Sequence, residues 1–147
     1  MRHVEDASPN ANSEFLHVAL ELQFASRDNV LVIRCLGRLL YGPEANDLVH
    51  AVRQALETTK EIVLQMAAVT QIDSGGVGAL GTAFMAAHNR EAQIKLAGLH
   101  PRVAEVLRIT NLEMLFDVRA SEDEAVAAFL AKAPQPAFTI DLTGKIA

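Results

Sequence analysis

The segment IDSGGVG, residues 72–78, holds the groups best placed to do chemistry in this 147-residue chain. It lies where a strand-like apolar run changes to a helical pattern, and ligands and partners of parallel sheets gather at such strand ends. Asp73 or Ser74 can cap the following helix by accepting hydrogen bonds from its first N–H groups. The three glycines permit a tight turn and the close approach of another backbone. This loop is therefore the first candidate site.

Three interpretations of the loop remain open on the residues alone. The first is a capped strand–helix turn with no further role. The second is a phosphate cradle for a nucleotide, because helix N-termini attract anions. Against it, the loop matches neither G-x-x-x-x-G-K-[ST] nor G-x-G-x-x-G, and no lysine follows. The third is phosphorylation of Ser74 in an exposed, glycine-rich turn, which would change the local charge by about −1.5 to −2.

The remaining polar residues form no recognisable active site. A Ser–His–Asp triad can assemble from distant residues, but the loop lacks the G-x-S-x-G pattern that exposes a nucleophile. The histidines show no H-x-x-x-H or similar ligand spacing, so we expect no metal site. They are His3, His17, His50, His88 and His100. We expect neither an enzyme nor a bound cofactor.

Composition narrows the classes of partner and compartment. Thirteen Lys and Arg residues against 18 Asp and Glu give a net charge of −5. This charge argues against a nucleic-acid partner, which needs a basic footprint. No apolar run approaches the roughly 18–20 residues that span a bilayer, and the acidic start MRHVEDASPNANSE does not resemble a signal peptide. We expect a cytoplasmic protein without membrane insertion, in which Cys35, the only cysteine, is buried and reduced.

The first two expected elements are strands. Residues 17–24 alternate strictly between apolar and other positions, as a half-buried strand does. Residues 30–36 are almost continuously apolar and β-branched, which suits a strand covered on both faces. Turn-forming residues at 26–29 join them, so the two strands should pair antiparallel at one edge of a sheet. Gly37 should end the second strand.

Strand–helix units follow. Apolar residues recur at helical spacing after Pro43, and residues 62–66 form a strand that extends loosely to residue 72. A second helix begins at Asp73, where Gly81 should let it approach the sheet closely. Residues 93–97 form the next strand.

The end of the domain repeats this alternation. Pro101 suits the first turn of a third helix, and residues 116–118 form a brief strand. Ser121 and Glu124 make a capping box that opens a fourth helix. Alternating strands and helices imply an α/β fold with a mainly parallel sheet and right-handed crossovers.

One domain is expected at residues 15–131, since a chain of this length suits a single compact unit. The polar residues 1–14 should form a mobile leader. Residues 132–147 are ambiguous, because Pro134 and Pro136 interrupt a helix while apolar residues after them alternate as in a short strand.

Residues 61–129 resemble the STAS domain of anti-sigma-factor antagonists. The segments that carry the resemblance are, in order, EIVLQMAAVTQIDSGGVGAL, IKLAGLHPRVAEVLRITNLEML, FDV and SEDEAV. Upstream, Gly37-Arg38-Leu39 is similar to the glycine-led turn after the family's second strand. The resemblance implies a STAS-like fold, a four- or five-stranded, mostly parallel mixed sheet flanked by about four helices.

The resemblance also implies partner switching with an anti-sigma factor of the serine-kinase type. In that family the kinase phosphorylates the serine directly after the loop aspartate, which here is Ser74 after Asp73. The unmodified domain binds the kinase and releases its sigma factor, whereas the phosphorylated domain does not bind. ATP and magnesium belong to the kinase. A second copy of this chain is a further candidate partner.

The partner-binding residues implied by the resemblance lie in the loop and in the upstream turn. They are Asp73, Gly75, Gly76, Gly78, Gly37, Arg38 and Leu40.

Three positions depart from the family's pattern. Gly75 stands where the family usually has a second Ser or Thr, and Gln65 replaces a commonly acidic strand residue. Leu40 lies where the family often has the aspartate of a G-x-L-D turn. The departures at Leu40 and Gly75 favour an alternative, a non-switching STAS module that serves as a scaffold or as an accessory to a membrane transporter. A nucleotide- or small-molecule-binding domain acting through residues 73–78 is a third alternative.

Overall fold

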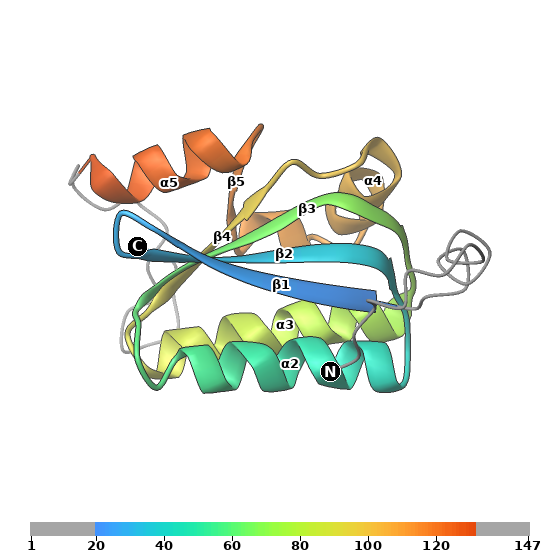
Figure 1. Cartoon of the computed structure of the whole chain (residues 1–147). Helices are drawn as coiled ribbons and strands as arrows, with labels where there is room; N and C mark the ends of the chain where they lie inside the picture. Colours follow the sequence, from blue (N-terminus) through green and yellow to red (C-terminus); the bar gives the residue numbers. More distant parts are fainter. Residues whose placement is uncertain (1–19, 132–147) are drawn as a thin grey trace, which may run out of the picture.

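The computed structural model describes residues 20–131, whose elements alternate as expected (Figure 1). The expected leader at residues 1–14 and the ambiguous tail at residues 132–147 lie outside this part of the chain. The elements are β1 (Leu20–Arg27), β2 (Val30–Leu39), α2 (Pro43–Ala55), β3 (Glu61–Ile72), α3 (Ser74–Asn89), β4 (Gln93–Ala97), α4 (Pro101–Ile109), the 3-10 turn η2 (Leu112–Met114), β5 (Asp117–Arg119) and α5 (Glu122–Leu130).

Five strands form one mixed sheet in the order β1-β2-β3-β4-β5. β1 pairs antiparallel with β2, and the other three neighbouring pairs are parallel. α2 and α3 lie side by side against one face, while α4 and α5 lie over the other (Figure 1). The predicted α/β architecture is confirmed. No helix within residues 20–131 has the length and apolar character needed to cross a membrane.

Asp28 and Asn29 close the hairpin between β1 and β2, with φ angles of 52° and 71°. Two consecutive residues with positive φ are typical of a type I′ turn, whose twist matches that of the flanking strands. Asp and Asn tolerate this conformation better than most other residues. The predicted turn is confirmed, although β1 extends through Arg27 and so includes half of the segment assigned to the turn.

β2 does not end at Gly37 as predicted but continues to Leu39. Gly37 has a φ of 116° and pairs with Val69 of β3, and the ladder shifts register between Arg34 and Leu36 and again between Gly37 and Arg38. Such shifts are β-bulges, which accommodate a glycine with positive φ without ending the strand. The expected glycine-led turn is therefore wrong. The turn falls at residues 40–42, where Gly42 has a φ of 110° and precedes α2.

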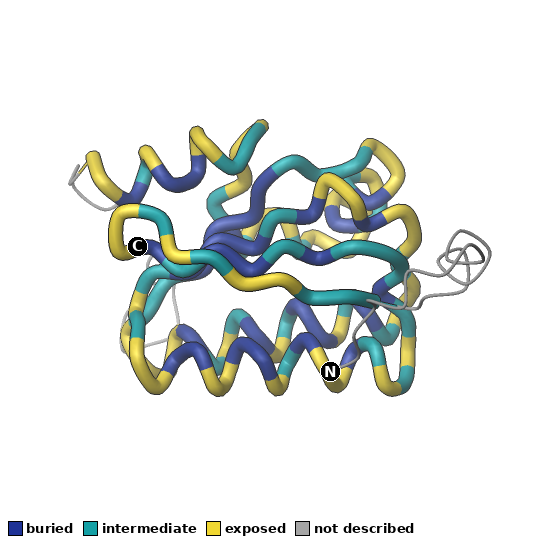
Figure 2. Tube along the Cα trace, viewed as in Figure 1, coloured by how far each residue is buried: buried dark blue, intermediate teal, exposed yellow. Residues whose placement is uncertain are grey.

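The main core lies against α2 and α3, whose buried positions face the strands (Figure 2), and it also includes Val103 and Leu107 of α4. Leu48 and Val52 of α2 and Leu80 of α3 are fully buried there. A second cluster lies between α5 and the opposite face of the sheet. Its members are Val30, Val32, Val63, Ala97, Ala125, Val126 and Phe129. The first halves of β2 and β3 are covered on both faces, which explains their nearly continuous apolar sequences.

An ion cluster joins α5 to the sheet. Glu122, the first residue of α5, accepts hydrogen bonds from Arg27 (2.7 Å) and from two nitrogens of Arg34 (3.0 and 2.8 Å). The Arg34 contact is the largest cause that lowers the pKa of Glu122 to about 2. The Gln65 side chain donates to Glu122 (3.4 Å) and accepts from the Ala67 N–H (2.8 Å). An acidic residue at position 65 would face the Glu122 carboxylate, so the neutral amide suits this neighbour.

Candidate functional site

Two loops meet at the carboxyl ends of β2 and β3, at the right of Figure 1. Leu39 pairs with Ile72 at the last step of the β2–β3 ladder. The turn at residues 40–42 and the start of α3 therefore begin side by side. We call residues 39–42 together with residues 73–78 the loop site.

Asp73 connects the two halves of the loop site. One carboxylate oxygen accepts the N–H of Gly76 (3.0 Å), which makes Asp73 the N-cap of α3. The other oxygen accepts the N–H of Tyr41 (3.1 Å) in the neighbouring loop. Both bonds favour the ionised carboxylate, and together, with the Gly76 contact first, they lower the pKa of Asp73. The predicted cap is confirmed, and it also fixes the loop that enters α2.

Gly75 and Gly76 allow the two loops to touch. A Cβ at position 75 would lie 2.5 Å from the Cα of Tyr41, and a Cβ at position 76 would overlap the carbonyl oxygen of Leu39. Backbone atoms cannot move aside as the end of a flexible side chain can. The space beside both glycines is thus filled from within the domain, which disfavours a phosphate cradle. A partner contact at these two glycines remains a prediction.

Ser74 is the first residue of α3 and is exposed. Its hydroxyl makes no hydrogen bond to any residue between positions 20 and 131, so it is available to another molecule. Gly78, one turn further along α3, is also exposed, and a Cβ there would meet no atom within 4 Å. These two positions, unlike Gly75 and Gly76, face outward.

The predicted upstream residues divide between loop and sheet. Leu40 belongs to the loop site, is half-buried, and accepts the N–H of Ala45 through its carbonyl oxygen (3.2 Å). Gly37 and Arg38 lie inside β2, where Arg38 pairs with Gln71. The buried Nε of Arg38 has no hydrogen-bond partner in the described part of the chain. Of the predicted partner-binding residues, only Gly37 and Arg38 are thus outside the loop site.

Tyr41 is a candidate that the sequence did not single out. Its side chain is 81% exposed, while its backbone is held by Asp73 and packs against Gly75. A single aromatic residue before Gly-Pro carries no periodicity, and its contact to Asp73 links positions 32 residues apart. Only its aromatic type in a short turn before Gly42 and Pro43 could have drawn attention to it.

A groove between α2 and α3 begins at Tyr41. His50 and Arg53 line it, and no carboxylate does, although the chain as a whole is acidic. The lining residues are Tyr41, Gly42, Ala45, Asn46, Val49, His50, Arg53, Gly75, Ala79 and Thr82. The groove shares Tyr41, Gly42 and Gly75 with the loop site, so the two surfaces are continuous.

The other polar candidates have structural roles. His100 caps α4 by accepting the N–H of Arg102 (3.1 Å), as expected for a residue before Pro101. His88 stacks on Phe84 with ring centroids 5.9 Å apart. Cys35 is buried as predicted, and desolvation raises its pKa to about 12. Residues 20–131 contain no group of three or more His, Cys, Asp or Glu side chains that could hold a metal ion.

The fold places the chain among small α/β domains built on a mostly parallel mixed sheet. Within that class, residues 21–125 match the STAS domain family, and the chain belongs to that family. STAS domains are typically regulators without catalytic activity. A STAS-domain containing protein of Pseudomonas aeruginosa (strain UCBPP-PA14) is 32% identical over 88 residues, which are 60% of this chain and 86% of that protein.

Solved structures with this fold include antagonists and transporter domains. The anti-sigma factor antagonist SpoIIAA in its unphosphorylated form has a TM-score of 0.58 at 16% identity, covering 78% of this chain and all of that one. Phosphorylated Bacillus SpoIIAA has a TM-score of 0.59 at 20% identity, and the match covers 76% of this chain and 99% of that one. A SulP transporter STAS domain from Vibrio cholerae has a TM-score of 0.55 at 17% identity, and the match covers 65% of this chain and 79% of that one. At these identities the likeness establishes the fold alone.

Proposed function

We propose that this chain is a cytoplasmic anti-sigma factor antagonist that acts by partner switching. Its partner is an anti-sigma factor of the serine-kinase type, and Ser74 is the residue that this kinase phosphorylates. The domain is not itself an enzyme and requires no cofactor. The observation that carries the proposal is the exposed Ser74 hydroxyl at the first residue of α3, directly after the Asp73 cap.

The phosphoryl transfer requires only a hydroxyl group from this chain. The γ-phosphoryl group of ATP passes to the Ser74 oxygen, a new P–O bond forms, and ADP leaves. The serine proton passes to a base on the kinase. ATP and magnesium are bound by the kinase.

The added phosphate would oppose binding of the partner. It brings about −1.5 to −2 charges next to Asp73, whose lowered pKa keeps its carboxylate ionised at neutral pH. Leaving such a charge buried and unpaired at an interface costs about 2–5 kcal/mol, or roughly 30-fold to 4,000-fold in affinity. In the free domain the amino end of α3 tolerates the phosphate, because the helix dipole favours negative charge there. The penalty therefore falls on the complex.

The direct test is intact-mass measurement after incubation with a cognate kinase and ATP. We expect the wild-type chain to gain one phosphate and Ser74→Ala to gain none. Thr70→Ala is the matched control, because Thr70 is another exposed hydroxyl near this end of the sheet, and it should gain one phosphate like the wild type. Full phosphorylation of Ser74→Ala would remove Ser74 from the proposal.

A second experiment tests charge as the mechanism. Ser74→Asp places a carboxylate at the phosphorylation position and should weaken kinase binding by about tenfold or more, a smaller loss than a dianionic phosphate causes. Ser74→Asn has a similar size without the charge and should bind within a few-fold of the wild type. Equal affinities of the two variants, measured by calorimetry, would contradict an electrostatic switch.

Leu40 favours a second candidate function. The related antagonists often carry an aspartate at this position, and here the side chain is apolar and half-buried. A STAS module without a switch, acting as a scaffold or transporter accessory, needs no carboxylate there. Recovery of transporter subunits and no kinase in a pull-down, unchanged by Ser74→Asp, would support this alternative over the antagonist.

A further inference from the structure

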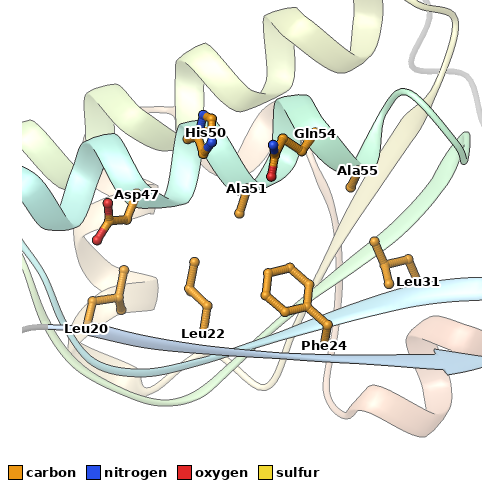
Figure 3. A pocket seen from close by; sticks show the side chains of 9 residues that line it. All are labelled: Leu20, Leu22, Phe24, Leu31, Asp47, His50, Ala51, Gln54 and Ala55. Carbon is orange, nitrogen blue, oxygen red and sulfur yellow. The ribbon is translucent and has the colours of Figure 1, made fainter. Parts of the chain in front are cut away.

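A groove lies beside β1, the strand at one edge of the sheet, with apolar side chains on the strand and Asp47, His50 and Gln54 on its α2 wall. Leu20, Leu22 and Phe24 point from β1 toward α2 and line the groove (Figure 3). Leu20 and Leu22 are half-buried, whereas the Phe24 side chain is 55% exposed. Within residues 20–131 no strand pairs with the outer side of β1. An apolar row beside an open strand edge is a template for pairing with another strand.

The turn geometry shows which backbone groups face that open edge. Arg27 and Val30 flank a two-residue turn and are paired, so they form a hydrogen-bonded pair of the ladder. Such pairs alternate along antiparallel strands. Every second residue of β1 before Arg27 therefore bonds to β2, and the residues between them direct their N–H and C=O groups outward. The outward set is Leu20, Leu22, Phe24 and Ser26.

We propose that a second copy of this chain binds along this edge, β1 against β1 and antiparallel, about a two-fold axis at Phe24. Phe24 then forms a hydrogen-bonded pair with Phe24 of the second copy, and Leu22 pairs with Ser26. In the same register Glu21 lies opposite Arg27 on both sides of the axis. One antiparallel register of two β1 strands thus pairs the outward backbone groups, brings the apolar rows together and places opposite charges across from each other.

The charges select this register over its neighbours. With the axis at Leu22, Glu21 would lie opposite Gln23, and Arg27 would lie beyond the paired part of β1. Arg27 already contacts Glu122 and Asp123 (2.7 and 2.9 Å). Glu21 of the second copy would therefore join the cluster that Arg27 forms with Glu122 and Asp123. These charges determine the register of the two strands more than they increase the affinity. The backbone ladder and the apolar side chains provide the binding.

The two-fold axis would run perpendicular to the sheet, so that α2 of both copies lies on the same side. The two grooves then join into one, and the Phe24 and Leu22 side chains of both copies meet between the two α2 helices. Each copy removes the other's exposed aromatic ring from water. This surface is separate from the loop site, so the inference does not depend on the proposed function.

Sedimentation equilibrium of the full chain tests the proposal. We expect a concentration-dependent mass that approaches twice the 15.9 kDa of one chain. Phe24→Lys places two cations against each other at the axis and should raise the dimer dissociation constant at least tenfold. Glu21→Arg opposes Arg27 and should raise it as well. Ile109→Lys is the matched control, because Ile109 is an exposed apolar residue on α4 (64%), and it should leave the dissociation constant unchanged.

Covalent trapping provides a second measurement that does not depend on affinity. Paired Cα atoms at a hydrogen-bonded position lie about 5.5 Å apart, within reach of a disulfide. Phe24→Cys should therefore form a disulfide-linked dimer on mild oxidation, and Ile109→Cys should not; Cys35 is buried and should not interfere. A wild-type monomer at all concentrations would overturn the proposal and leave another segment or another protein as the occupant. A dimer that survives Phe24→Lys and gives no Phe24→Cys cross-link would overturn it equally.

Discussion

At the loop site one carboxylate performs two tasks. Asp73 caps α3 through Gly76 and holds the backbone of Tyr41 in the adjacent loop. Ser74 and Tyr41 are therefore presented from a backbone that is fixed before any partner arrives. A surface ordered in advance loses less conformational entropy on binding, so more of the contact energy remains as affinity.

Gly75 and Gly78 lie three residues apart in one helix and predict opposite responses to the same change. Gly75→Ala should lower the free energy of unfolding by about 1–3 kcal/mol, because the new methyl group would lie 2.5 Å from the Cα of Tyr41. Gly78→Ala meets nothing within 4 Å and should raise that free energy by about 0.5–1 kcal/mol through helix propensity. Urea denaturation measures both. Equal effects of the two variants would show that the loops do not pack as described.

Truncation of the Tyr41 side chain should weaken partner binding without lowering the stability of the domain. Exposed aromatic residues in a fixed position are frequent hot spots, and their truncation costs about 2 kcal/mol or more, roughly 30-fold in affinity. Tyr41→Ala should show this loss toward the proposed kinase partner, with the melting temperature unchanged, because Tyr41 is 81% exposed. Met85→Ala, on an exposed residue of α3 outside the groove, should bind as the wild type does. Unchanged affinity of Tyr41→Ala would exclude the α2–α3 groove from the interface.

At the scale of elements, periodicity predicted the strands and helices because each buries one face or both. It failed where the deciding contact comes from a distant segment. Gly81 was expected to approach the sheet closely, yet a Cβ there would make only an ordinary contact with Leu112 at 3.9 Å. At Gly75, by contrast, the absence of a side chain is what allows the backbone of Tyr41 to come close. The bulge at Gly37 was also missed, because a glycine with positive φ suits a turn and a bulge equally well.

The candidate site could be predicted in part for the same reason. Asp73 and Ser74 stand at a strand–helix junction, and capping chemistry is readable from adjacent residues. Tyr41 enters the site only because the ladder ends at Leu39 and Ile72 bring two loops together. That proximity depends on the register of parallel strands, which no local pattern determines.

The attachment of α5 predicts a specific acid sensitivity. The pKa of Glu122 falls from 4.5 to about 2 in the folded chain. The ion cluster therefore contributes stability in full above pH 4.5 and loses it as the pH falls toward 2. Both arginines are partly exposed, so we expect a contribution of about 2 kcal/mol, less than the full pKa shift implies. Glu122→Gln should lower the free energy of unfolding by this amount at pH 7, and the difference from wild type should shrink toward zero near pH 2.

Urea denaturation at several pH values measures this difference. Glu105→Gln is the control, because Glu105 pairs with Arg108 on the exposed surface of α4, where ion pairs contribute little. Its stability should follow that of the wild type at each pH. A difference between Glu122→Gln and wild type that does not change with pH would show that packing, and not charge, holds α5 in place.

For the whole molecule, the loop site and the β1 edge should act independently. Phe24 pairs with Ile33, and Leu39 at the loop site lies six residues further along β2, a distance of roughly 20 Å at about 3.3 Å per residue. This exceeds the screening length of about 8 Å at physiological salt, so a charge at Ser74 should have little effect at the proposed axis at Phe24, although Leu20, at the near end of β1, pairs with Gly37 only two residues before Leu39. We expect Ser74→Asp to leave the dimer dissociation constant within twofold of wild type, and Phe24→Lys to leave the extent of Ser74 phosphorylation unchanged. Sedimentation and intact-mass measurements on the same preparations test both directions. Thermodynamic coupling between two sites must be reciprocal, so a shift of dimerisation on phosphorylation would require dimerisation to shift the phosphorylation equilibrium by the same factor.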